Sequence, residues 1–181
     1  MERGAECDRY QPPREYTHFQ ELLDNLPYAL MGLCGGALLL AGLGASLLGW
    51  LAAWLYLAYC VAGALWIMVF VCPYCHYYGT RTCPCGYGQV SARLVPKRQD
   101  NRFVKQFRKH IPVIIPLWLI PVIAGLAFYV RDRSRVMLVL LIVFAADAFV
   151  LLPLVSRLYG CGHCPQKTDC PWMLSRERRS V

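Results

Sequence analysis

Seven of the ten cysteines in this chain of 181 residues fall into two clusters whose spacing suits metal or redox chemistry. The first cluster follows the pattern C-x2-C-x7-C-P with one further cysteine, and the second follows C-x2-C-x5-C-P. The first contains Cys72, Cys75, Cys83 and Cys85, and the second contains Cys161, Cys164 and Cys170. A C-x2-C pair puts two sulfur atoms on one tight turn, where they can bind one metal ion or form a disulfide.

Three kinds of chemistry use cysteines in this arrangement. Zinc takes four sulfur or nitrogen ligands, and an iron–sulfur cluster takes four thiolates, with proline following the last cysteine of ferredoxin runs. A thiol–disulfide pair needs only two sulfurs and an electron acceptor. In a reducing compartment clustered cysteines are more typical of metal ligands. We therefore expect all seven cysteines to be ligands, and the choice between an iron–sulfur cluster and Zn(II) stays open.

The number of ligands also does not decide whether the two clusters form separate metal centres or share one. The first cluster supplies four sulfurs within one loop, which is a complete set. The second supplies three, so it would need His163, Cys7 or a cysteine from the first loop. The alternative is a shared centre that takes both C-x2-C pairs.

The elements that must hold these clusters are membrane helices. Hydrophobic residues make up 57% of the chain and charged residues 17%, against roughly 45–50% and about 25% in soluble proteins. Residues 26–71 and 111–130 contain no charged residue or histidine, and residues 136–156 contain only Asp147. Because a membrane helix needs about 20 apolar residues, the sequence predicts an all-α integral membrane four-helix bundle. This composition excludes a soluble enzyme, a DNA-binding domain and a disordered tail.

The chain divides into two transmembrane hairpins and three polar segments. We expect an acidic leader with an interfacial helix over 1–26, hairpins over 27–71 and 111–156, a loop over 72–110 and a tail over 157–181. The first helix is predicted to start at Pro27 and end near Ala45, with its turn inside 42–49. Pro112, Pro116 and Pro121 predict a distorted third helix. Because each cysteine cluster follows a hairpin, the pattern suggests an internal repeat.

The basic residues predict the orientation. The leader, the loop and the tail share one face and carry sixteen Lys and Arg, against three in the turn between the last two helices. The positive-inside rule places that face, with the N-terminus, the cysteine-rich loop and the C-terminus, in the cytoplasm of the cell membrane. The segment 97–109 is basic with one apolar face, which favours docking to the lipid bilayer, or alternatively to an acidic redox partner protein or subunit. No nucleic-acid-binding module is present.

Asp147 is the only charge within the predicted fourth helix. An acid inside a membrane is costly and is therefore a functional-site hypothesis, for proton uptake beside a quinone or for cation passage. A protonated aspartate with a structural hydrogen bond is an equally good interpretation.

The leading hypothesis is an electron-transfer module with iron–sulfur centres on the cytoplasmic face, passing electrons to a quinone or a partner subunit. A structural zinc-binding membrane protein is the first alternative. The second is a thiol–disulfide oxidoreductase, because four membrane helices with a C-x2-C pair at a helix end resemble disulfide-forming and vitamin K epoxide reductase-type enzymes. Those enzymes work on the oxidising side and lack the doubled three-cysteine motif. A soft-metal transporter would need more intramembrane ligands than Cys34 and Cys60.

Overall fold

The computed structural model describes residues 15–99 and 102–161, and every regular element within those ranges is helical. Within the described residues, four helical segments are long and apolar enough to cross a membrane, which agrees with the predicted number and is consistent with a multi-pass membrane protein. These segments are His18–Leu43, Leu47–Tyr74, Phe103–Asp132 and Arg135–Leu158. The segments contain α1 (His18–Leu43), α2 (Leu47–Phe70), α4 (Phe103–His110), α5 (Pro116–Asp132), α6 (Arg135–Ala146) and α7 (Leu152–Val155).

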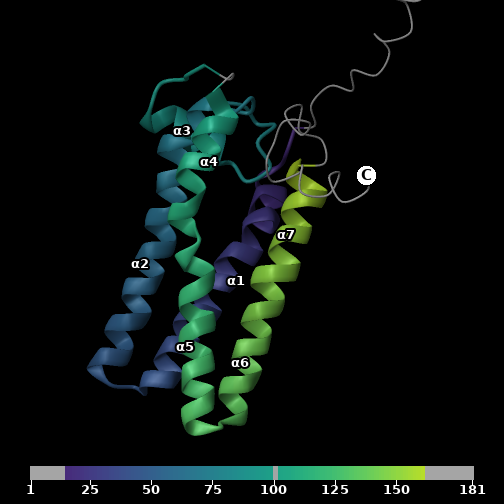
Figure 1. The fold of residues 1–181 in the computed structure, drawn as a ribbon. Helices are drawn as coiled ribbons and strands as arrows, with labels where there is room; N and C mark the ends of the chain where they lie inside the picture. The colour runs from purple at the N-terminus through teal and green to yellow at the C-terminus, as the bar shows by residue number, and fades with distance from the viewer. Residues whose placement is uncertain (1–14, 100–101, 162–181) are drawn as a thin grey trace, which may run out of the picture.

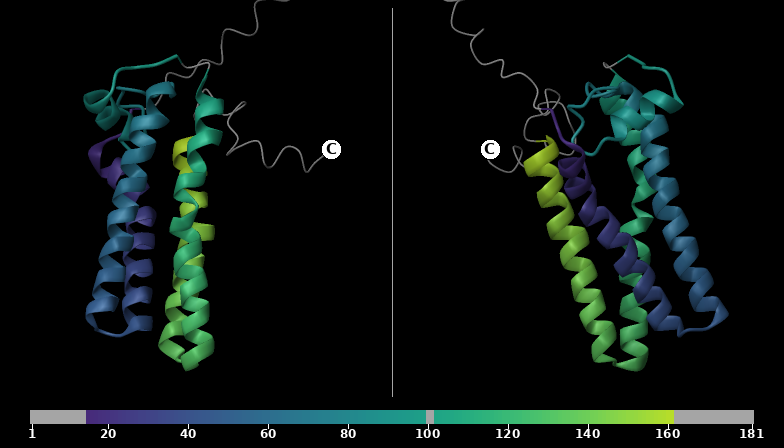
Figure 2. Two further views of the ribbon diagram at one scale, coloured as in Figure 1. Left: turned by 60° about the vertical axis from the view of Figure 1, so that its left-hand side comes forward. Right: turned by 180° about the vertical axis from the view of Figure 1, so that it is seen from behind.

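The helices run as two hairpins placed side by side (Figure 1). The α1–α2 turn and the α5–α6 turn lie at one end of the molecule, as all three views show (Figures 1 and 2). The opposite end gathers the start of α1, the short α3 (Tyr87–Leu94), α4 and the end of α7. Helix α1 packs against α2, α5 and α6 and so connects the two hairpins.

Helix α1 begins nine residues earlier than predicted. A capping box starts it: the Thr17 hydroxyl accepts from the Gln20 N–H at 3.3 Å, and the Gln20 side chain accepts from the Thr17 N–H at 3.0 Å. Such a cap satisfies N–H groups that the first turn leaves without partners. Pro27 lies inside the helix, where it removes only one backbone hydrogen bond. The second half of the expected leader is therefore continuous with the first membrane helix.

The turn between α1 and α2 falls inside the predicted segment 42–49. Gly44 adopts φ +74° at the end of α1, a left-handed conformation that glycine takes without a steric penalty. Two residues later the Ser46 hydroxyl accepts a hydrogen bond from the Gly49 N–H at 3.1 Å and caps α2. Three residues, 44–46, suffice to reverse the chain because both helix ends have their own local stop signals.

The third membrane helix is distorted, as its prolines predict. The 3-10 segment η4 (Ile111–Ile114) separates α4 from α5. Pro112 and Pro116 cannot donate backbone hydrogen bonds, so the regular α-helical ladder is interrupted between the two helices.

The fourth membrane helix contains a π-helical segment, η5 (Asp147–Leu151), between α6 and α7. Pro153 has no N–H for the carbonyl of Phe149, which favours wider backbone spacing here. Asp147 is 7% exposed, and neither carboxylate oxygen has a hydrogen-bond partner among the described residues. A second π-helical segment, η6 (Ser156–Cys161), follows α7.

Small residues on α1 bring it close to α2. A Cβ atom on Gly35 would lie 2.5 Å from the ring of Tyr56, so the bare glycine backbone makes room for that ring. The Tyr56 hydroxyl in turn donates to the carbonyl of Leu117 on α5 at 2.8 Å. This arrangement links α1, α2 and α5 through one buried side chain.

Candidate metal centre

The first C-x2-C pair forms a tight turn at the end of α2. The 3-10 segment η2 (Cys72–Tyr74) follows α2, and the Cys75 N–H donates to the Cys72 carbonyl at 3.0 Å. Pro73 and Tyr74 are buried beneath the turn. Proline fixes the backbone at the first position of such a turn, so the sequence Cys-Pro-Tyr-Cys specifies this geometry locally.

The Cys83-Pro-Cys85 segment holds two sulfur atoms in contact. The two Sγ atoms are 3.7 Å apart, and Cys83 is buried. The Gly86 N–H donates to the Cys83 carbonyl at 3.1 Å and closes a turn at φ +71°. The next element, α3, begins at Tyr87, so its first turn lies directly beside the thiols.

A backbone N–H group points at one of these sulfurs. The Gly88 N–H donates to Cys83 Sγ at 3.3 Å. N–H···S hydrogen bonds stabilise the thiolate form and tune a bound metal or cluster. Glycine is needed here because a Cβ atom on residue 88 would lie 2.5 Å from the carbonyl oxygen of Tyr77.

The two thiols of this pair differ in acidity. The hydrogen bond from the Cys85 thiol, with further help from the Gly88 N–H, lowers the pKa of Cys83 to about 7. The same bond, followed by burial, raises the pKa of Cys85 well above its ordinary value. Near neutral pH, Cys83 is therefore partly thiolate while Cys85 remains a thiol. The thiolate is the form that binds metals and attacks disulfides.

The first pair lies near the second. Cys72 is close enough to Cys75 and Cys83 to interact with both electrostatically, and it also affects Cys85. Within residues 15–99 and 102–161, however, no three His, Cys, Asp or Glu side chains converge on one point as metal ligands. The structure thus brings the four cysteines of the first cluster into one loop, with Cys83 and Cys85 as its paired thiols.

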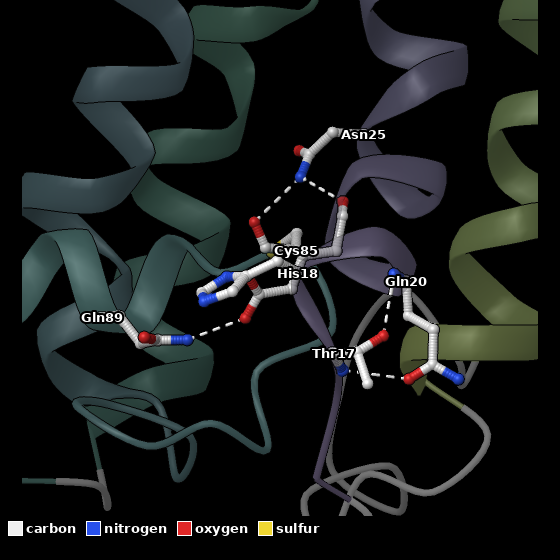
Figure 3. A network of polar contacts seen from close by, with 7 residues as sticks. Thr17, His18, Gln20, Asn25, Cys85 and Gln89 are labelled. Carbon is white, nitrogen blue, oxygen red and sulfur yellow. Dashed lines mark hydrogen bonds and ion pairs between the residues drawn. The ribbon is translucent and has the colours of Figure 1, made fainter.

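Helix α1 holds this loop in place through polar contacts (Figure 3). The Asn25 amide donates to the carbonyl of Cys85 at 2.9 Å and to that of Glu21 at 2.8 Å. The Gln89 amide donates to the Glu21 carboxylate at 2.8 Å. These residues are missing from the sequence-based site, because Asn25 and Cys85 are 60 positions apart and no local pattern links them.

The second cluster is described only at its start. The backbone of Cys161 ends η6, at the same end of the molecule as α3 (Figure 1). Cys164 and Cys170, and the alternative ligands His163 and Cys7, lie outside the described residues. The described residues therefore show only that the second cluster begins at the same end of the helices as the first cluster.

No protein-family model, curated protein or solved structure is significantly similar to this chain. The functional argument therefore rests on the cysteines and their surroundings.

The acidity of Cys83 can be measured directly. We expect the rate of Cys83 alkylation by iodoacetamide, followed by peptide mass spectrometry, to rise with pH with a midpoint near the pKa of about 7. The fraction of thiolate increases as the pH rises through this value, so reactivity is lost on the acid side. A Cys85→Ala variant lacks the hydrogen-bond donor, and its midpoint should move toward the ordinary value of about 8.5. Equal midpoints in the two proteins would contradict the assigned hydrogen bond.

Proposed function

We propose that this chain is an electron-transfer protein of the cell membrane that binds an iron–sulfur cluster through the cysteines at one end of its helices. The Cys83–Cys85 pair supports the proposal most strongly. Its sulfurs are 3.7 Å apart, and the Gly88 N–H donates to one of them. Thiolates that accept backbone N–H groups are typical ligands of such clusters. Cys72 and Cys75 would complete a set of four, after rotation of their side chains.

The orientation, the role of the second cluster and the electron acceptor are proposed from the charge and position of the residues. The excess of basic residues on the face of the cysteine loop supports a cytoplasmic location for that face, according to the positive-inside rule. Cys161, Cys164 and Cys170 would hold a second centre or share the first. A membrane quinone or a partner subunit would exchange electrons with the cluster, and Asp147 is the candidate proton acceptor beside a quinone.

Metal analysis of the full chain tests the proposal. Protein purified in detergent without oxygen should contain iron and acid-labile sulfide in near-stoichiometric amounts, with a visible absorption that reductant bleaches. A Cys72→Ser/Cys75→Ser double variant should lose both iron and sulfide. The matched control is Cys34→Ser, because Cys34 lies within α1 and not in the loop. Unchanged metal in the double variant would reject these ligands, and zinc without sulfide would favour the structural zinc protein.

A second candidate function is thiol–disulfide exchange, and the contact between Cys83 and Cys85 favours it. Joining the two sulfurs would release two protons and two electrons, and a membrane quinone would take them up as the quinol. Protein without bound metal, in which Cys83 and Cys85 are found oxidised and reducible, would support this reaction over the cluster. The loop should then also react in intact cells with a membrane-impermeant thiol reagent, which would place it outside the cytoplasm.

A further inference from the structure

A pocket of about 240 Å³ lies at the end of α2, and its lining includes Tyr74 of the first C-x2-C turn but none of the cysteines. It is partly open, and it is lined by residues of α2, of the turn that follows α2 and of α4, together with Arg98 from the segment after α3. Six residues line it: Phe70, Tyr74, Arg98, Gln106, Lys109 and His110. Two of them, Arg98 and Lys109, carry positive charge and are exposed, and none is acidic. The pocket thus offers cationic and amide donors to a ligand of opposite charge.

Arg98 is held at the pocket by three contacts. Its guanidinium donates to the Tyr74 hydroxyl at 3.0 Å and lies over the Tyr74 ring, 5.7 Å from its centroid. Its backbone N–H donates to the carbonyl of Pro73 at 2.8 Å. Because these contacts already order the long Arg98 side chain, binding of an anion would cause a smaller loss of side-chain entropy.

Aromatic rings form the opposite wall and attach α4 to α2. The Phe70 ring stacks on His110, with centroids 5.0 Å apart and planes inclined by 18°. Trp66 continues this wall, with its ring centroid 4.3 Å from that of Phe70. Trp66 and Phe70 are 36% and 38% exposed, so these two rings extend the pocket wall onto the exposed apolar surface of α2.

Basic residues beside an exposed apolar wall indicate the class of ligand. The pocket lies where the spanning segments Leu47–Tyr74 and Phe103–Asp132 reach one end of the helices, which is the depth of lipid headgroups. Basic pockets between membrane helices bind anionic headgroups. A soluble anion would need the basic residues but not an apolar wall that continues along the helix. We propose that this pocket binds the phosphate group of an anionic phospholipid, whose acyl chains lie along α2 over Phe70 and Trp66.

Quenching of tryptophan fluorescence by brominated lipid chains tests this binding, independently of any bound metal. The full chain in phosphatidylcholine vesicles would be titrated with dibrominated phosphatidylglycerol, or with dibrominated phosphatidylcholine for comparison. We expect quenching at lower concentrations of the anionic lipid, and a Trp66→Phe variant should lose much of the difference. An Arg98→Gln/Lys109→Gln double variant should bind the anionic lipid about thirty-fold more weakly in total. Each charge that is removed should weaken binding by roughly tenfold or less.

The matched control removes the same charge outside the pocket, from the N-cap of α4 and from α4 itself. Arg102→Gln/Lys105→Gln should weaken binding only slightly, since both residues are exposed and do not line the pocket. A Gln106→Glu variant, which places an acid in the pocket, should also abolish the preference for anionic lipid. Equal losses in the two double variants would overturn the pocket in favour of a diffuse basic surface. Competition by millimolar inorganic phosphate would overturn the lipid in favour of a soluble anion.

Discussion

A Gly88→Ala variant should lose the low pKa of Cys83 and most of the iron of the proposed cluster, although no cysteine is changed. A Cβ atom on residue 88 would lie 2.5 Å from the carbonyl oxygen of Tyr77 and 3.2 Å from its carbonyl carbon. Both are backbone atoms, so α3 must move away from the loop and the Gly88 N–H must leave Cys83 Sγ. Overpacking of this kind costs about 1–3 kcal/mol. The measurements are the pH midpoint of Cys83 alkylation and the metal content.

Val90→Ala is the matched control for this variant. Val90 lies two residues later on α3 and is 41% exposed, so its truncation leaves the packing against Tyr77 intact. The control should keep both the alkylation midpoint and the metal of the unchanged protein. If Gly88→Ala behaved like Val90→Ala, the close approach of α3 to the loop would be refuted. If Gly88→Ala raised the alkylation midpoint of Cys83 but kept the normal metal content, only the role of the Gly88 N–H group in metal binding would be rejected.

The second large effect is expected at the opposite end of the helices, at Gly42. A Cβ atom there would lie 1.9 Å from Cδ2 and 2.5 Å from Cγ of Phe128 on α5, so the whole ring must move. The Arg131 guanidinium, which lies over that ring at 5.3 Å, donates to the Gly42 carbonyl at 2.8 Å. Gly42→Ala should therefore separate α1 from α5 and lower the free energy of unfolding by about 1–3 kcal/mol. Unfolding of the protein in detergent micelles measures this change.

Two further variants test whether the clash with Phe128 causes the stability loss of Gly42→Ala. Gly32→Ala is the control on the same helix, because its nearest neighbour, Cys60 Sγ, would be at an ordinary contact distance of 3.6 Å. It should be neutral or slightly stabilising, since alanine favours helices by up to about 1 kcal/mol over glycine. Combining Gly42→Ala with Phe128→Ala should recover part of the stability, because the ring that causes the clash is gone. If the stability losses of the two single substitutions simply added in the double variant, the clash with the Phe128 ring would not be the cause of the loss at Gly42.

Local patterns in the sequence were sufficient to predict the four membrane helices. Long charge-free runs need no knowledge of neighbouring chain segments, since each helix satisfies its own backbone hydrogen bonds in lipid. The turn around Gly44 and Ser46 and the distortion near Pro112 follow from residue types that fix the backbone on their own. The predicted start of α1 was wrong because a proline is compatible with the interior of this helix, whose first turn is instead set by the capping box at Thr17.

The candidate site was predicted only in part. The cysteines and the tight turn after Cys72 are local features of the sequence. The contact between Cys83 and Cys85 depends on side-chain rotamers, which the spacing of two cysteines does not determine.

The sequence by itself determined which segments enter the membrane, where the chain turns and at which helix ends the cysteines stand, because apolar length, proline and glycine act on the backbone nearby. Only the tertiary structure decided that Asn25 holds the carbonyl of Cys85 and that His110 stacks on Phe70 to complete a basic pocket. Those contacts join residues far apart in the chain, and their formation depends on how whole helices pack, which no local pattern encodes.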